Sequence, residues 1–199
     1  MISKEIKKIT KKDLISLEQY SKNRSEIRKD IIKYKKNRRV QLGPYASFYF
    51  ECYKTMLAQV QEMLYIEKGG EKQIEDELNA YNPLVPNGKE LVATLMFEID
   101  NPVLRNIFLN KIGGIEKKIY LKIGLKKIYS LPEKDVERTS EEGKSSSVHF
   151  VHFNFAEDQI KKFKDTTFSG LSLGIEHSEY SHETTISNST RISLSEDFY

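Results

Sequence analysis

The sequence has little of several residues and motifs on which common protein classes depend. It contains one cysteine, Cys52, and no tryptophan among 199 residues. One cysteine cannot form an internal disulfide or a thiolate cage around a metal, which favours a reducing, cytoplasmic location. No apolar run approaches the roughly 18 to 20 residues that a membrane-spanning helix needs. We therefore expect a protein without a membrane span.

Several motifs that mark bound cofactors are also missing. The chain has no P-loop, no G-x-G-x-x-G and no C-x-x-C. The sequence thus gives no positive support for nucleotide-dependent chemistry or for zinc or iron–sulfur ligation, and we predict no cofactor. What it does contain is 38% apolar and 31% charged residues, with 11 Tyr and 10 Phe. This composition is typical of an ordered globular protein with a sizeable core.

Positive charge is concentrated at one end of the chain. Residues 1–40 hold 14 Lys and Arg against 5 Asp and Glu, a net charge of +9, whereas the remainder holds 18 against 24. The densest part of this region contains Lys35, Lys36, Arg38 and Arg39. Such a cluster indicates either a solvated helix end, which the helix macrodipole favours, or contact with phosphates or an acidic protein.

The first part of the chain, residues 1–82, is predicted to be a basic helical region with a β-hairpin. Apolar spacing and capping residues predict helices that begin at Thr10 and at Ser25. A period-two segment around Gly43-Pro44 then predicts the hairpin, and Thr55 opens a helix with an apolar stripe. A turn-rich connector, residues 82–88, is the best internal boundary in the sequence.

The second part, residues 88–178, reads as strand, helix, strand, and then strand, helix, strand again. This order predicts a ferredoxin-like split βαβ fold, with both helices on one face of an antiparallel or mixed sheet. The expected class is α+β, with the N-terminal helices and hairpin packed on that sheet in one compact unit. Residues 179–199 form a Ser/Thr-rich tail in which a weak terminal helix and fraying are equally expected.

Candidate catalytic residues are few. Residues 170–174 match the G-x-S-x-G pattern of serine hydrolases, but the expected strand runs through Ser172, so the required strand–turn–helix elbow is absent. We expect its hydroxyl to lie on a sheet face. Cys52 is expected to be buried in the core.

Histidines offer one alternative, a His and carboxylate site for a divalent transition metal. His149 and His177 could meet if their strands are neighbours, with Glu62, or else Glu51 or Glu67, as the carboxylate. His149 and His152 are an odd number of residues apart, so on one strand they point to opposite faces. Histidines satisfied by hydrogen bonds at a sheet edge are the competing interpretation.

A set of short motifs is spread over nearly the whole chain: Lys35–Val40, Leu42–Pro44, Gln59–Leu64, Ala80–Pro86, Ala93–Met96, Gly113–Glu116, Ser147–Phe150 and Gly174–His177. Together they resemble the bacterial domain-of-unknown-function family numbered 3501. The chain departs from the family's Asp-His-Pro at Glu176-His177-Ser178. The resemblance implies a single-module bacterial protein associated with rubrerythrin-like and iron–sulfur proteins.

Residues and resemblance together favour an accessory or binding protein in a redox or oxidative-stress setting over a self-sufficient enzyme. Its partner is then an acidic protein, in particular a redox protein. We expect the basic cluster to contact that partner, and Gln59, Gln61 and Glu62 to form the polar edge of a nearby groove. There are two alternative functions: binding of RNA or DNA through the basic cluster, and a metal-dependent enzyme. The sequence does not decide whether the protein forms a homo-oligomer.

Overall fold

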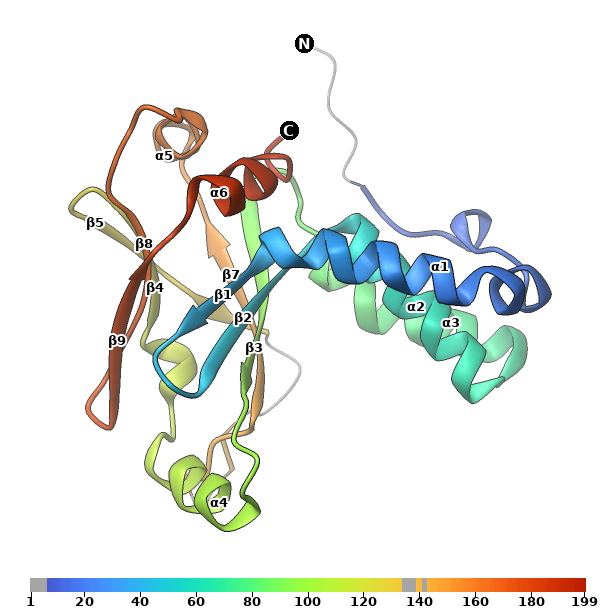
Figure 1. Cartoon of the computed structure of the whole chain (residues 1–199), viewed down its shortest axis with the longest axis horizontal. Coiled ribbons are helices and arrows are strands. Elements are labelled where there is room, and N and C mark those ends of the chain that lie inside the picture. The colour runs from blue at the N-terminus through green and yellow to red at the C-terminus, as the bar shows by residue number, and fades with distance from the viewer. Residues whose placement is uncertain (1–6, 134–138, 141–142) are drawn as a thin grey trace.

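The protein contains two antiparallel sheets (Figure 1), which share one hydrophobic core. The computed structural model describes residues 7–133, 139–140 and 143–199. In spatial order, the first sheet consists of β1 (Arg39–Leu42), β2 (Ala46–Glu51), β3 (Glu90–Phe97), β7 (Val148–Asn154) and β6 (Leu131–Pro132). The second consists of β5 (Lys126–Tyr129), β4 (Ile119–Ile123), β8 (Leu171–His177) and β9 (Tyr180–Thr185).

Alternation along the strands decides which side chains enter this core. Successive residues of a strand point to opposite faces. In β2, Phe48 and Phe50 enter the core between the sheets, while Tyr49 and Glu51 point away from it. The same alternation in β3 places Thr94 on the outer face of the first sheet. That outer face carries the candidate site.

Helices α2 (Tyr53–Glu67) and α3 (Gly70–Tyr81) pack over the outer face of the first sheet, and α1 (Leu17–Lys35) lies against α2 to complete a helical layer (Figure 1). Met56, Val60 and Leu64 of α2 pack with Val92 of the sheet in a second hydrophobic cluster. Their helical spacing forms the apolar stripe that the sequence predicts. The sequence predicts two helices where α1 is continuous, because neither glycine nor proline interrupts residues 17–35.

Three shorter helices complete the fold: α4 (Pro102–Lys111), α5 (Glu157–Lys164) and α6 (Asn188–Ser195). Pro102 occupies the first turn of α4, as predicted, where its missing N–H costs nothing. Arg191 of α6 is buried and donates hydrogen bonds to the carbonyl oxygens of four residues at and beyond the end of α5: Lys162, Phe163, Asp165 and Phe168. The last carbonyls of a helix have no partner within it, so Arg191 satisfies groups that would otherwise be buried unpaired.

The α+β class is confirmed, but the ferredoxin-like arrangement is not what the structure shows. The prediction places the four strands of residues 88–178 in one sheet. Instead, β3 and β7 pair in the first sheet, and β4 and β8 pair in the second. Each strand–helix–strand unit therefore crosses between the sheets. The error arises because element order does not specify which strands pair.

The structure shows how the predicted regions and the C-terminal segment are joined. The hairpin of β1 and β2 joins β3 and β7 in one sheet, so the two predicted regions share their main structural element. Residues 179–199 supply β9 at the edge of the second sheet and helix α6, and this terminal helix is one of the two outcomes that the sequence predicts for the segment. Among the described residues, no helix has the length and apolar character needed to cross a bilayer.

Candidate ligand-binding cavity

A cavity of about 280 Å³ lies between the helical layer and the outer face of the first sheet. Its floor is formed by outward residues of three neighbouring strands: Tyr49, Glu51, Thr94, Met96, Val148 and Phe150. Its other walls come from the helical layer and the turn that follows it: Lys35, Met56, Gln59, Tyr81 and Leu84. Small-molecule sites are concave, mostly apolar, and carry a few convergent polar groups, and this cavity has the same character.

Glu51 is the buried charged group of the floor, with 5% of its surface exposed. Its two carboxylate oxygens accept hydrogen bonds from different hydroxyls, at 2.7 Å from Thr55 and at 2.8 Å from Thr94. Thr55 also accepts a hydrogen bond from the backbone N–H of Cys52, at the start of α2. The strand and the helix start thus hold the carboxylate in one orientation.

Lys35 contributes the opposite charge on the other side of the cavity. It is the last residue of α1, where a cation is favoured by the helix macrodipole. In the part of the chain that the structure describes, Lys35 and Glu51 form no ion pair with each other or with another residue. The cavity therefore carries one unpaired charge of each sign.

A groove of about 230 Å³ between α1 and α2 shares Lys35 and Gln59 with this cavity. Glu62 lines the groove and holds the two helices together. It accepts hydrogen bonds from the Tyr20 hydroxyl at 2.7 Å and from Arg24 at 2.6 Å. These contacts, with the Arg24 guanidinium as the main cause, lower the pKa of the Glu62 carboxyl. Gln59 and Glu62 thus both line this groove, and their role as the polar edge of a docking site stays a prediction.

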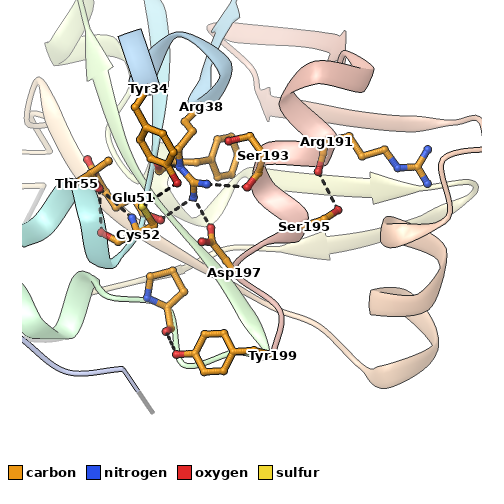
Figure 2. Close-up of polar contacts among 12 residues, drawn as sticks. Tyr34, Arg38, Glu51, Cys52, Thr55, Arg191, Ser193, Ser195, Asp197 and Tyr199 are labelled. Atoms are coloured by element: carbon orange, nitrogen blue, oxygen red, sulfur yellow. Dashed lines mark hydrogen bonds and ion pairs between the residues drawn. The ribbon is translucent and has the colours of Figure 1, made fainter. Parts of the chain in front are cut away.

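Arg38 requires a correction, because it is 1% exposed and cannot contact a partner surface. Figure 2 shows its guanidinium pointing inward, toward Ser193 and Asp197 of the C-terminal segment. It pairs with the Asp197 carboxylate and donates to the carbonyl oxygens of Ser193, at 2.8 Å, and Phe50, at 3.0 Å. A 3-10 turn at Lys36–Arg38 follows α1 and directs this side chain into the protein.

The other predicted partner-binding residues separate into different settings. Lys36 and Arg39 are exposed, and Arg39 pairs with Glu98 at 2.9 Å on the surface. Gln61 is buried, where it accepts from the Ile15 N–H at 3.0 Å and donates to the Ile15 carbonyl at 3.1 Å. Gln61 is therefore an internal bridge rather than part of a docking edge. Contact of Lys36 and Arg39 with an acidic protein or nucleic acid stays a prediction.

The predicted metal residues are not brought together. His149 points into the core, where its ring packs edge-on against Phe97 and its Nε2 lies 2.9 Å from the Ser146 carbonyl oxygen. His177 lies at the end of β8, with Nε2 3.3 Å from the Gly113 carbonyl oxygen. Glu62 lies in the helical layer. No group of three His, Cys, Asp or Glu suited to a metal occurs among the residues described.

Two expectations about nucleophiles agree with the structure. Ser172 lies within β8, without a nucleophile elbow, and donates to Glu183 of the neighbouring strand at 2.9 Å. Cys52 is buried, and its sulfur lies 3.6 Å from the Tyr34 hydroxyl oxygen (Figure 2). Both side chains are accounted for by packing and hydrogen bonding.

His152 lies on the outer face, opposite to His149 as predicted, between two carboxylates. Its Nδ1 is 3.0 Å from Glu90 and its Nε2 is 2.8 Å from Glu133. Burial opposes the charged imidazole, but the hydrogen bonds to Glu90 and Glu133 outweigh it and raise the pKa of His152 above 6.5. The two carboxylates thus favour the protonated form of this histidine.

This arrangement predicts a specific pH dependence of stability. A histidine whose pKa is higher in the folded state stabilises the fold fully below its unfolded pKa, and loses that contribution as the pH rises through the folded pKa. A tenfold higher proton affinity in the folded state corresponds to about 1.4 kcal/mol of stability. We therefore expect the free energy of unfolding to fall from pH 6 to pH 9, and this slope to flatten in His152→Gln. Urea unfolding across this pH range measures the slope.

The control is His182→Gln, because His182 is exposed. An unchanged slope in His152→Gln would contradict the assignment.

Comparison with known proteins places the chain in a family. The profile described as "Protein of unknown function (DUF3501)" matches residues 8–198. The chain belongs to this family. The chain is also similar to a novel protein of unknown function from Burkholderia pseudomallei, solved by crystallography. It is 34% identical, with a TM-score of 0.90, and the match covers 97% of this chain and 100% of that one. A search among functionally curated proteins gives no match.

Membership of the family thus confirms the resemblance seen in the sequence, and it assigns no activity. Of the residues singled out by sequence, Lys35, Gln59 and Glu51 meet at the cavity. Sequence reasoning missed Thr94, a single polar residue within the apolar segment 91–97. An isolated polar side chain in a buried strand is the signal that could have identified it, since such a group needs a hydrogen-bond partner.

Proposed function

We propose that this member of the family is a binding protein whose ligand occupies the cavity above Glu51. The observation that carries the proposal is the buried Glu51 carboxylate, which faces a cavity and lacks a cationic partner among the described residues. Burial of an ionised carboxylate is costly unless it is paired and hydrogen-bonded. Two hydroxyls supply part of that compensation, and a ligand in the cavity would supply the rest.

The setting we propose is the one that the sequence resemblance implies: an accessory role in a bacterial redox or oxidative-stress system. Lys36 and Arg39 are exposed beside Lys35 and suit an acidic protein partner. Affinity purification from the native host, with metal analysis of the eluate, tests this setting. An eluate in which redox proteins are not enriched over a mock purification would contradict it.

Binding in the cavity is tested by filling it. Val148 lines the cavity and is half-buried, so Val148→Trp should occupy the space, while Val103→Trp adds the same ring to the exposed surface of α4. Saturation-transfer NMR with a set of organic amines, carboxylates, zwitterions and neutral compounds is the measurement. We expect at least one class of compound to bind both the wild type and the Val103→Trp protein. Its affinity for Val148→Trp should be at least tenfold lower.

The melting temperature of each variant shows whether it is folded. Equal binding to Val148→Trp and wild type, or no binding of any class to wild type, would refute the cavity as a ligand site.

A further inference from the structure

The charges of the cavity lining restrict the ligand further than its shape does, and this inference rests on the proposed function. Glu51 and Lys35 both line the cavity, on the sheet side and the helix side respectively. Neither forms an ion pair within the described chain. A ligand with one charge would compensate one of these groups and leave the other without a partner.

The Glu51 side of the cavity is suited to an ammonium group. A carboxylate offers about four acceptor positions, and the Thr55 and Thr94 hydroxyls use one on each oxygen. An ammonium group carries three donors and no acceptor, so it matches the remaining positions. Charge-assisted hydrogen bonds of this kind are about twice as strong as neutral ones.

The Lys35 side is suited to a carboxylate. Lys35 lines the cavity wall together with Gln59 and Tyr81. Exposed cations at the same end of α1, Lys33 and Lys36, add positive potential nearby. Anionic groups would therefore be attracted to this side.

Apart from these charged groups, the cavity lining is largely apolar. Its lining includes two thioethers, two aliphatic side chains and a phenyl ring: Met56, Met96, Leu84, Val148 and Phe150. The volume of about 280 Å³ lies just below the range of roughly 300 to 1,000 Å³ that is usual for small-molecule sites. The bound molecule is thus small, with an apolar body.

We propose that the cavity binds a small zwitterion of the α-amino acid type with an apolar side chain, its ammonium at Glu51 and its carboxylate at Lys35. The apolar lining takes the side chain. Calorimetric titration with L-leucine, with 3-methylbutylamine and with 4-methylpentanoate tests this assignment, because the two analogues each keep one charge. We expect both analogues to bind at least tenfold more weakly than L-leucine.

Two substitutions assign the ends of the ligand. Glu51→Gln should weaken L-leucine and the amine at least tenfold and leave the acid unchanged. Lys35→Met should weaken L-leucine and the acid and leave the amine unchanged. Melting temperatures show whether each variant is folded. Lys35 is partly exposed, so Lys35→Met can still be tested if Glu51→Gln does not fold.

The outcomes separate this inference from the proposed function. If the amine or the acid binds as tightly as L-leucine, or if neither substitution changes L-leucine affinity, the zwitterion is refuted. In that case, a compound that binds the wild type but not Val148→Trp still supports the proposal that the cavity is a ligand site. If no compound binds the wild type, both proposals fail together.

Discussion

Replacing Arg38 with methionine is expected to lower the free energy of unfolding by about 3 to 5 kcal/mol. The substitution would leave the Asp197 carboxylate buried without its cation, and the Phe50 and Ser193 carbonyl oxygens without their donor. Removing one partner of a buried ion pair costs more than the pair itself contributes, because the remaining charge is desolvated without compensation. Urea unfolding followed by circular dichroism measures the change.

Arg39→Met is the matched control for this prediction. Arg39 is the next residue in the chain and also pairs with a carboxylate, but its side chain and that of Glu98 are each 44% exposed. Exposed ion pairs contribute about 0 to 1 kcal/mol, so this variant should remain close to the wild type. Equal losses in the two variants would contradict the burial of Arg38. In the double variant Arg38→Met/Asp197→Leu, part of the stability should return, since no unpaired charge remains.

Replacing Arg191 with methionine is expected to cost about 3 kcal/mol or more. Its guanidinium donates to four carbonyl oxygens at the end of α5, and hydrogen bonds to a charged group contribute about 1.5 to 3 kcal/mol each. Methionine would fill part of the space without supplying a donor. The carbonyl groups would then stay buried and unsatisfied, and α5 would loosen from α6.

The control for Arg191 is Lys161→Met, which removes a positive charge from the exposed side of α5. Thermal unfolding should show a large decrease for Arg191→Met and a small change for Lys161→Met. Native-state hydrogen exchange should also increase at the α5 amides in Arg191→Met alone. Similar melting temperatures for the two variants would show that the clamp contributes little.

Local structure follows from the sequence where a residue type has one strong conformational role. Pro102 begins α4 as expected, and the segments predicted as strands at β2, β3 and β7 are strands. Sheet membership does not follow, because β3 and β4 are adjacent in the chain yet belong to different sheets. Strand pairing depends on contacts distant in sequence, and alternation of residues along one strand carries no information about them.

The candidate site is only partly readable from the sequence, and the basic cluster shows why. Lys35 and Arg38 are three residues apart, yet Lys35 lines the cavity and Arg38 lies inside the protein. The 3-10 turn after α1 changes the direction of the side chains, and the buried partner of Arg38, Asp197, is 159 residues away. A charge cluster therefore indicates a surface only where no distant residue of opposite charge pairs with it.

The central claim is that a small apolar zwitterion binds over Glu51, and amide NMR during titration with L-leucine tests it most directly. The account predicts saturable shifts at the amides of Glu51, Thr94 and Phe150, which belong to three neighbouring strands of the cavity floor. Amides of the second sheet, such as Leu173, should stay in place. Saturable shifts confined to residues outside the cavity, or none up to millimolar L-leucine, would contradict it.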